Sequence, residues 1–168
     1  MRILVTAASR HGATAELAAA IAKRLATYGF DVTLAEPRAV ATLDGYDAVV
    51  LGSAVYAGRW MKPAREFAER LSAELSARPV WLFSSGPVGD PPQPSGQSVD
   101  VKQVSELTGA HSHRVLAGHL DRDVLGLVER LIVRAVGAVD GDFRDWAEVA
   151  AWTDEIARAL DPANAPSA

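Results

Sequence analysis

The sequence predicts a single α/β domain of three layers, with helices covering both faces of a doubly wound parallel sheet of five strands. Short apolar runs alternate with helical segments along the chain, which is typical of a parallel sheet with crossover helices. Within the helical segments, apolar residues recur at four-residue spacing, so one side of each helix faces a core. A chain of 168 residues is long enough to bury a substantial core of this kind.

The predicted strands are short runs rich in Val, Ile, Leu and Ala, as expected when both faces of a strand are buried. They cover residues 3–6, 31–35, 47–52, 80–84 and 114–118. Alternation with helices favours the doubly wound strand order 2-1-3-4-5.

Three helices are predicted from apolar residues spaced by four. The three sets are Leu17, Ile21 and Leu25; Phe67, Leu71 and Leu75; and Trp152, Ile156 and Leu160. Pro63 suits the first turn of the second helix. Two further helices are predicted at residues 99–107 and 123–136.

We expect one domain over residues 1–160 and a disordered tail over residues 161–168, which contain two prolines.

The composition excludes several classes of function. A net charge of −4 argues against nucleic-acid binding, which needs a basic surface. The absence of cysteine excludes thiol catalysis and cysteine-ligated metals. With neither a signal peptide nor a long apolar run, the expected location is the cytoplasm.

The first predicted loop joins a strand to a helix and has the composition of a phosphate site. Its residues are Ser9, Arg10, His11, Gly12, Ala13 and Thr14. Backbone N–H groups converge at such a turn, and the positive end of the helix dipole favours an anion. A Walker loop is excluded because no Lys-Ser or Lys-Thr pair follows Gly12. The alternative is a plain turn in which Thr14 caps the helix.

The second and third loops have the composition of a slot for a flat conjugated ring. The second loop includes Ala54, Val55, Tyr56, Ala57 and Gly58, and the third includes Ser85, Gly86, Pro87, Val88 and Gly89. Tyr56 supplies an aromatic wall, and main-chain groups of the third loop can bind the polar edge of the ring. Trp60 is the second choice for the wall; its alternative is packing beneath the next helix.

These three loops, in this order, resemble those of the flavodoxin family, and the chain is most similar to its menaquinone-dependent protoporphyrinogen oxidase type. The similarity rests on Ser-Arg-x-Gly-x-Thr from Ser9, Tyr-Asp-x-Val-Val-x-Gly from Tyr46, Ala117-Gly118 and Asp145-Trp146. The resemblance implies the flavodoxin-like fold and noncovalent FMN held by the three loops. Tyr56 stands where that oxidase type tends to be basic, which leaves the substrate open.

The resemblance also implies an FMN-dependent oxidoreductase that passes electrons from an organic substrate to a quinone or another acceptor. The alternatives are an electron carrier serving a redox partner protein and an interaction module without cofactor. The chemistry would belong to the flavin, so no catalytic side chain is assigned. No metal site is expected: alternation puts His111 and His113 on the same side of a strand, but no third ligand accompanies them.

The predicted helix over residues 123–136 has an unusually broad apolar half. Burial of that half against the sheet is one interpretation. The other is that part of it contacts a membrane surface, a quinone or a second copy of the chain, because a helix on one sheet needs only a narrower stripe. Peripheral membrane association and a homo-oligomer are therefore included among the expectations.

Overall fold

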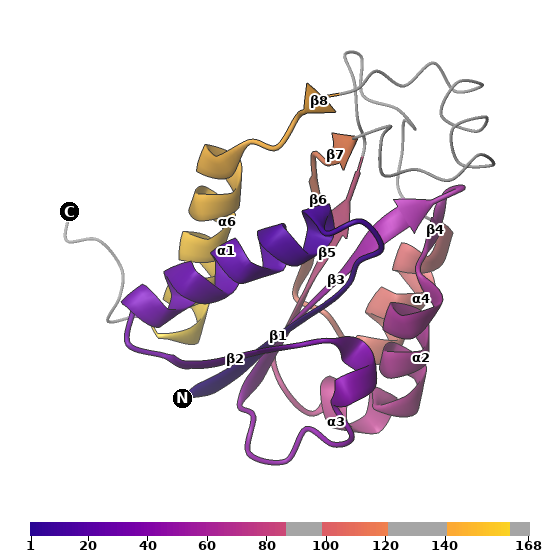
Figure 1. Cartoon of the computed structure of the whole chain (residues 1–168). Helices are drawn as coiled ribbons and strands as arrows, with labels where there is room; N and C mark the ends of the chain where they lie inside the picture. The colour runs from indigo at the N-terminus through magenta and orange to yellow at the C-terminus, as the bar shows by residue number, and fades with distance from the viewer. Residues whose placement is uncertain (87–98, 121–140, 162–168) are drawn as a thin grey trace.

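The computed structural model describes residues 1–86, 99–120 and 141–161. Its centre is a parallel sheet with helices on both faces (Figure 1), which confirms the predicted fold class. Within the described residues, the parallel strands follow the order β2-β1-β3-β5-β6, the predicted order 2-1-3-4-5. Their bounds are β1 Arg2–Ala8, β2 Asp31–Ala35, β3 Ala48–Tyr56, β5 Val80–Ser85 and β6 Ser112–Leu116. A short strand, β4 (Arg59–Trp60), pairs antiparallel with β3.

Burial explains the composition of the strands. The central strands β1, β3 and β5 are apolar because helices cover both of their faces, and Val5, Val50 and Leu82 are fully buried. β2 forms the edge of the sheet and is partly exposed.

Of the five predicted strands, β2 has the predicted bounds, β1 and β5 are one to three residues longer, and β3 and β6 differ most. β3 continues past residue 52 to Tyr56, because Val55 and Tyr56 pair with β4. β6 begins at Ser112 and ends at Leu116, two residues before the predicted bounds, because its backbone pairs with β5 from Trp81 onward. The start of this strand is polar, so apolar content alone places it too late.

One face of the sheet is covered by α1 (Ala13–Thr27) and α6 (Trp146–Leu160) (Figure 1). The predicted apolar positions of α1 are fully buried, as are Ile156 and, almost fully, Trp152 in α6. Asp145 caps α6 by accepting hydrogen bonds from the Ala147 and Glu148 amides at 2.9 and 3.0 Å. The two helices are joined by Arg24, which donates to Asp154 at 2.5 and 2.7 Å.

The opposite face is covered by α2 (Lys62–Arg70), α3 (Ser72–Ser76), α4 (Val99–Thr108) and the short 3-10 helix η1 (Pro37–Ala39) (Figure 1). Pro63 lies in the first turn of α2, as predicted. The prediction of one continuous helix here is wrong at Leu71, whose φ of −109° and ψ of 20° separate α2 from α3. Phe67, Leu71 and Leu75 are nevertheless all buried, because α3 continues along the same face.

A separate two-stranded ladder lies beyond β6. β7 (His119–Leu120) and β8 (Gly141–Asp142) pair antiparallel. Arg144 follows β8 and donates to Asp142 and to Glu16 of α1, and the hydrogen bonds to Asp142 are the main cause of its raised pKa. The predicted helix over residues 123–136 and the predicted tail beyond residue 161 lie outside the described residues. In the described ranges, no helix is both long and apolar enough to span a bilayer.

Candidate functional site

The register of the sheet brings the starts of the three predicted loops together. β1 pairs with β3 through Ala8 and Ser53, and β3 pairs with β5 through Ala54 and Ser85. Neighbouring strands lie about 4.8 Å apart, so the segments that follow β1, β3 and β5 begin side by side. This is the carboxyl edge of the sheet, where doubly wound folds bind ligands.

The first loop turns from β1 into α1 at a glycine. Gly12 has a φ of 92° and is the N-cap residue, and none of the described side chains caps the helix. The Gly12 amide donates to Ser9 Oγ at 3.2 Å. The alternative in which Thr14 caps the helix is therefore wrong. Thr14 instead lies buried in the first turn of α1. The first N–H groups of a helix have no acceptor within it, so this end of α1 favours an anion.

His11 and Tyr56 bring the first two loops into contact. Their ring centroids lie 6.3 Å apart with an interplanar angle of 67°, an edge-to-face arrangement. Tyr56 is 38% exposed, so much of its surface remains accessible. Arg10 is exposed on the same loop as His11, and Ala13 is the first residue of α1.

The second predicted loop is a tight β-hairpin. Tyr56 of β3 pairs with Arg59 of β4. The two residues between them, Ala57 and Gly58, have φ values of 49° and 74°. Two successive residues of positive φ are typical of a type I′ turn, whose twist matches that of the flanking strands. The tight turn at Gly58 agrees with the prediction, but most of the predicted loop is paired strand, because pairing extends almost to the turn.

The remaining residues of the second loop lie in β3. Ala54 is buried and Val55 half-buried. Val55 pairs with Trp60 across the hairpin.

Trp60 belongs to the core. It is 1% exposed and packs in the apolar cluster between the sheet and α2. Its indole N–H donates to Ser84 Oγ at 2.7 Å. The assignment of Trp60 as a second aromatic wall is therefore wrong, and the alternative of packing beneath the next helix is correct.

The third loop begins with a third backbone turn at the same edge. Ser85 is buried at the end of β5, and Gly86 follows with a φ of 98°. The Gly86 amide donates to the Leu116 carbonyl at 3.0 Å, which ties the loop to the end of β6. The other predicted residues of this loop, Pro87, Val88 and Gly89, lie outside the described part of the chain.

A buried carboxylate lies behind the hairpin. The Asp100 side chain in α4 is 2% exposed, and Arg59 Nη2 donates to it at 2.7 Å. The Trp60 amide donates to the same carboxylate at 2.8 Å. Burial alone would raise the pKa of Asp100, but the hydrogen bonds from Arg59 and Trp60 outweigh it and hold that pKa below the usual value. Asp100 is thus an ionised anchor for β4.

A second chain of polar groups links the hairpin to β5 and β6. Ser84 Oγ accepts from the Trp60 indole and lies 2.8 Å from His113 Nε2. The Ser84 hydroxyl donates to Nε2 when the His113 proton is on Nδ1, and Ser84 Oγ accepts when the proton is on Nε2. Nδ1 is buried and has no hydrogen-bond partner among the described residues. Burial lowers the pKa of His113.

The predicted pairing of His111 and His113 on one side of a strand is wrong. His111 stacks on Trp81, with ring centroids 5.1 Å apart, whereas His113 contacts Ser84 and the Trp60 ring. Trp81 and Trp60 belong to the clusters on opposite faces of the sheet. His111 precedes β6, so strand alternation does not govern its direction.

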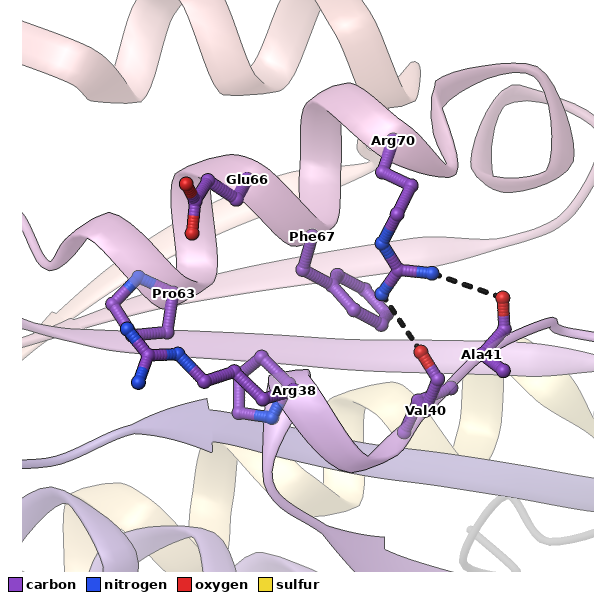
Figure 2. A pocket seen from close by; sticks show the side chains of 8 residues that line it. Arg38, Val40, Ala41, Pro63, Glu66, Phe67 and Arg70 are labelled. Atoms are coloured by element: carbon purple, nitrogen blue, oxygen red, sulfur yellow. Dashed lines mark hydrogen bonds between the residues drawn. The ribbon is translucent and has the colours of Figure 1, made fainter.

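A pocket of about 360 Å³ lies between η1 and α2, on the side of the sheet away from α1. Arg70 borders it and donates to the Val40 and Ala41 carbonyls at 2.7 and 2.9 Å (Figure 2). Its lining residues are Pro37, Arg38, Val40, Ala41, Pro63, Glu66, Phe67 and Arg70. None of them belongs to the three loops, so this pocket is distinct from the candidate site.

Solved structures share the fold. A flavodoxin from Streptococcus pneumonia TIGR4 superposes with a TM-score of 0.67 at 20% identity, over 95% of this chain and 99% of that one. A flavodoxin from the domain Archaea gives 0.65 at 18% identity, again over 95% and 99%. Rubredoxin oxygen:oxidoreductase from Desulfovibrio gigas gives 0.68 at 13% identity, over 99% of this chain but 37% of that one. At such identities the likeness concerns the fold.

Sequence comparison gives the family. The chain is 23% identical to protoporphyrinogen IX dehydrogenase (quinone) of Escherichia coli strain K12, over 96% of this chain and 97% of that protein. The model of the family described as Flavodoxin domain matches residues 4–146, which is most of the chain and includes all three loops. The protein therefore belongs to the flavodoxin domain family.

Proposed function

We propose that the protein binds FMN noncovalently at the carboxyl edge of the sheet and acts as an FMN-dependent oxidoreductase. The observation that carries the proposal is a shared feature of the three neighbouring loops. Gly12, Gly58 and Gly86 each have positive φ, and apart from their chain neighbours no described residue lies within 4 Å of where a Cβ would sit. Each loop thus turns at a residue that leaves room for a ligand to approach the chain closely, which is what a cofactor held by main-chain groups requires.

Each loop has a separate role in this proposal. The segment from Ser9 to Thr14 would hold the phosphate through the N–H groups of the first helical turn, with Arg10 adding positive charge. Residues 54–58 would lie against the ring, with Tyr56 as the wall. Ser85 and Gly86 would present main-chain groups to the polar edge of the ring. Bound FMN would supply the transfer of one or two electrons.

The relative in Escherichia coli supports a proposal for the substrate class. Its name describes a dehydrogenase that uses quinone, and the two chains match over nearly their full lengths. We therefore propose that this protein transfers electrons from an organic substrate to a quinone or a similar acceptor. The second candidate is an electron carrier for a protein partner, favoured by the full-length superposition on two flavodoxins. Quinone-dependent turnover with an organic donor distinguishes the enzyme from the carrier.

The experiment that tests FMN binding compares FMN with riboflavin by calorimetry. The protein should bind FMN about one to one and more tightly than riboflavin, on the order of tenfold, because an anion at a helix N-terminus contributes up to about 2 kcal/mol. Gly12→Leu should weaken FMN more than riboflavin, since a side chain there occupies the phosphate position.

Gly29→Leu is the matched control. Gly29 also has positive φ, 85°, with open space around it, but it precedes β2 at the opposite edge of the sheet. Its replacement should cost stability without changing the preference for FMN. Equal affinity of the wild-type protein for FMN and riboflavin would contradict the proposal.

A further inference from the structure

We propose that Asp100 is a positioning residue for the flavin ring: it fixes the β3–β4 hairpin and thereby the place of Tyr56. This inference rests on the proposed function, because it assigns Asp100 a role in the FMN site. Asp100 is itself too deeply buried to contact a ligand, so it would act through the hairpin.

The contacts of Asp100 converge on β4. Arg59 donates to the carboxylate through Nε and Nη2, the shortest distance being 2.7 Å, and the Trp60 amide donates at 2.8 Å. Arg65 of α2 adds a second positive charge at 4.0 Å. The carboxylate therefore binds the side chain of one β4 residue and the backbone of the other.

Holding β4 also holds the end of β3. Tyr56 pairs with Arg59 and Val55 pairs with Trp60, and only two residues separate the strands. A two-residue turn leaves the strands little freedom to move independently. A second anchor acts on the next residue, since the Met61 amide donates to Ser53 Oγ at 2.8 Å.

The bonds between Asp100 and β4 join two elements that are far apart in the sequence. Asp100 lies in the first turn of α4, the helix that follows the third loop in sequence. Its bonds to β4 therefore connect the element after the third loop with the hairpin of the second.

Stability alone does not account for a buried charge at this place. Burying a carboxylate costs free energy that pairing with arginine often only balances, and apolar replacements are commonly as stable. A buried ionic group can instead select one conformation. At Asp100 the selected conformation is that of the hairpin.

The test uses Asp100→Asn, with Asp154→Asn as the matched control. Asp154 also accepts two hydrogen bonds from an arginine, Arg24, and one from Tyr28, but it joins α1 to α6 away from the hairpin. In the FMN-free protein, Asp100→Asn should speed hydrogen exchange of the amides at residues 57–60 by on the order of tenfold, the effect of losing a bond to a charged group. Asp154→Asn should leave these amides unchanged.

With FMN present, Asp100→Asn should raise the dissociation constant on the order of tenfold. It should also brighten the fluorescence of bound flavin, because Tyr56 no longer stays against the ring. The control should change neither, even where its loss of melting temperature is as large. Should Asp100→Asn fail to fold, Arg59→Met replaces it, since the Arg59 side chain is 56% exposed and its loss leaves the Trp60 bond in place.

The outcomes separate the two proposals. If Asp100→Asn leaves hydrogen exchange at residues 57–60 unchanged, Asp100 does not anchor the hairpin, whatever ligand the protein binds. Faster exchange with unchanged FMN affinity and fluorescence overturns the positioning role and leaves Asp100 a structural residue. A wild-type protein that binds no FMN overturns the proposed function, while the exchange measurement still tests the anchor.

Discussion

The first loop and the β3–β4 hairpin share one edge of the sheet, but different interactions hold them. The first loop is shaped by its neighbours in sequence: Gly12 turns the chain, and its amide bonds to Ser9 Oγ. The hairpin is held from behind by Asp100 and Ser84, which are distant in sequence. A site for a phosphate needs exposed backbone, whereas a wall against a ring needs a fixed side chain. Local turns can expose the backbone, whereas only tertiary packing can fix the side chain.

The largest expected effect comes from the strand that carries the hairpin. A Cβ on Gly52 of β3 would lie 2.1 Å from Phe83 Cζ, and Phe83 is fully buried and in edge contact with Trp152. Gly52→Ala should therefore lower the free energy of unfolding by about 3 kcal/mol, the upper end for overpacking. Gly12→Ala, with open space around it, should cost about 1 kcal/mol from its positive φ. Urea unfolding measures both. Equal losses would mean that the two regions are equally free to adjust.

The next effect concerns the exposed end of the hairpin. Tyr56→Ala should weaken FMN binding by about 0.5–1.5 kcal/mol and brighten the bound flavin, because a ring contact is lost. Tyr46→Ala is the control: Tyr46 contacts the Arg2 guanidinium, 5.1 Å from its ring centroid, near the opposite end of β3. Unchanged affinity and fluorescence in the Tyr56 variant would assign Tyr56 to packing against His11.

The smallest effect is a pH dependence on the hairpin side. Burial lowers the pKa of His113, so the folded protein resists protonation at His113 more than the unfolded chain does. Stability should therefore fall as the pH drops below about 6.5, by less than about 1.4 kcal/mol per pH unit from this residue. His113→Gln should flatten that decline between pH 7 and 5, measured by urea unfolding. A decline as steep as in the wild type would show that His113 does not cause it.

Sequence reasoning recovers what depends on local pattern. The apolar strands, the buried seam of α1 and the glycine turn before it are all encoded within a few neighbouring residues. The strand order follows from general rules of chain connection. The positive-φ glycines of the three loops lie where the chain order of strands and helices places them.

The remainder depends on contacts between distant residues. β4 is two residues long, which is too short to show the alternation of apolar and polar residues that is typical of a strand. The sequence therefore predicts a loop where the structure has a hairpin. The sequence is compatible with Trp60 either as a wall for the ring or as a core residue, and the hydrogen bond from its indole to Ser84 distinguishes them. From the sequence, Asp100 is an ordinary acidic residue in the first turn of a helix. No residue near it in sequence indicates that it pairs with Arg59.

The β7–β8 ladder bears on how this family can diversify. Leu120 and Gly141 are paired across the ladder, so the two ends of the segment between them are adjacent, about 5 Å apart. The returning end is secured where Arg144 binds Glu16. Lengthening a connection between fixed ends adds little free energy. Changes of length between residues 120 and 141 should therefore cost the described part of the fold little free energy.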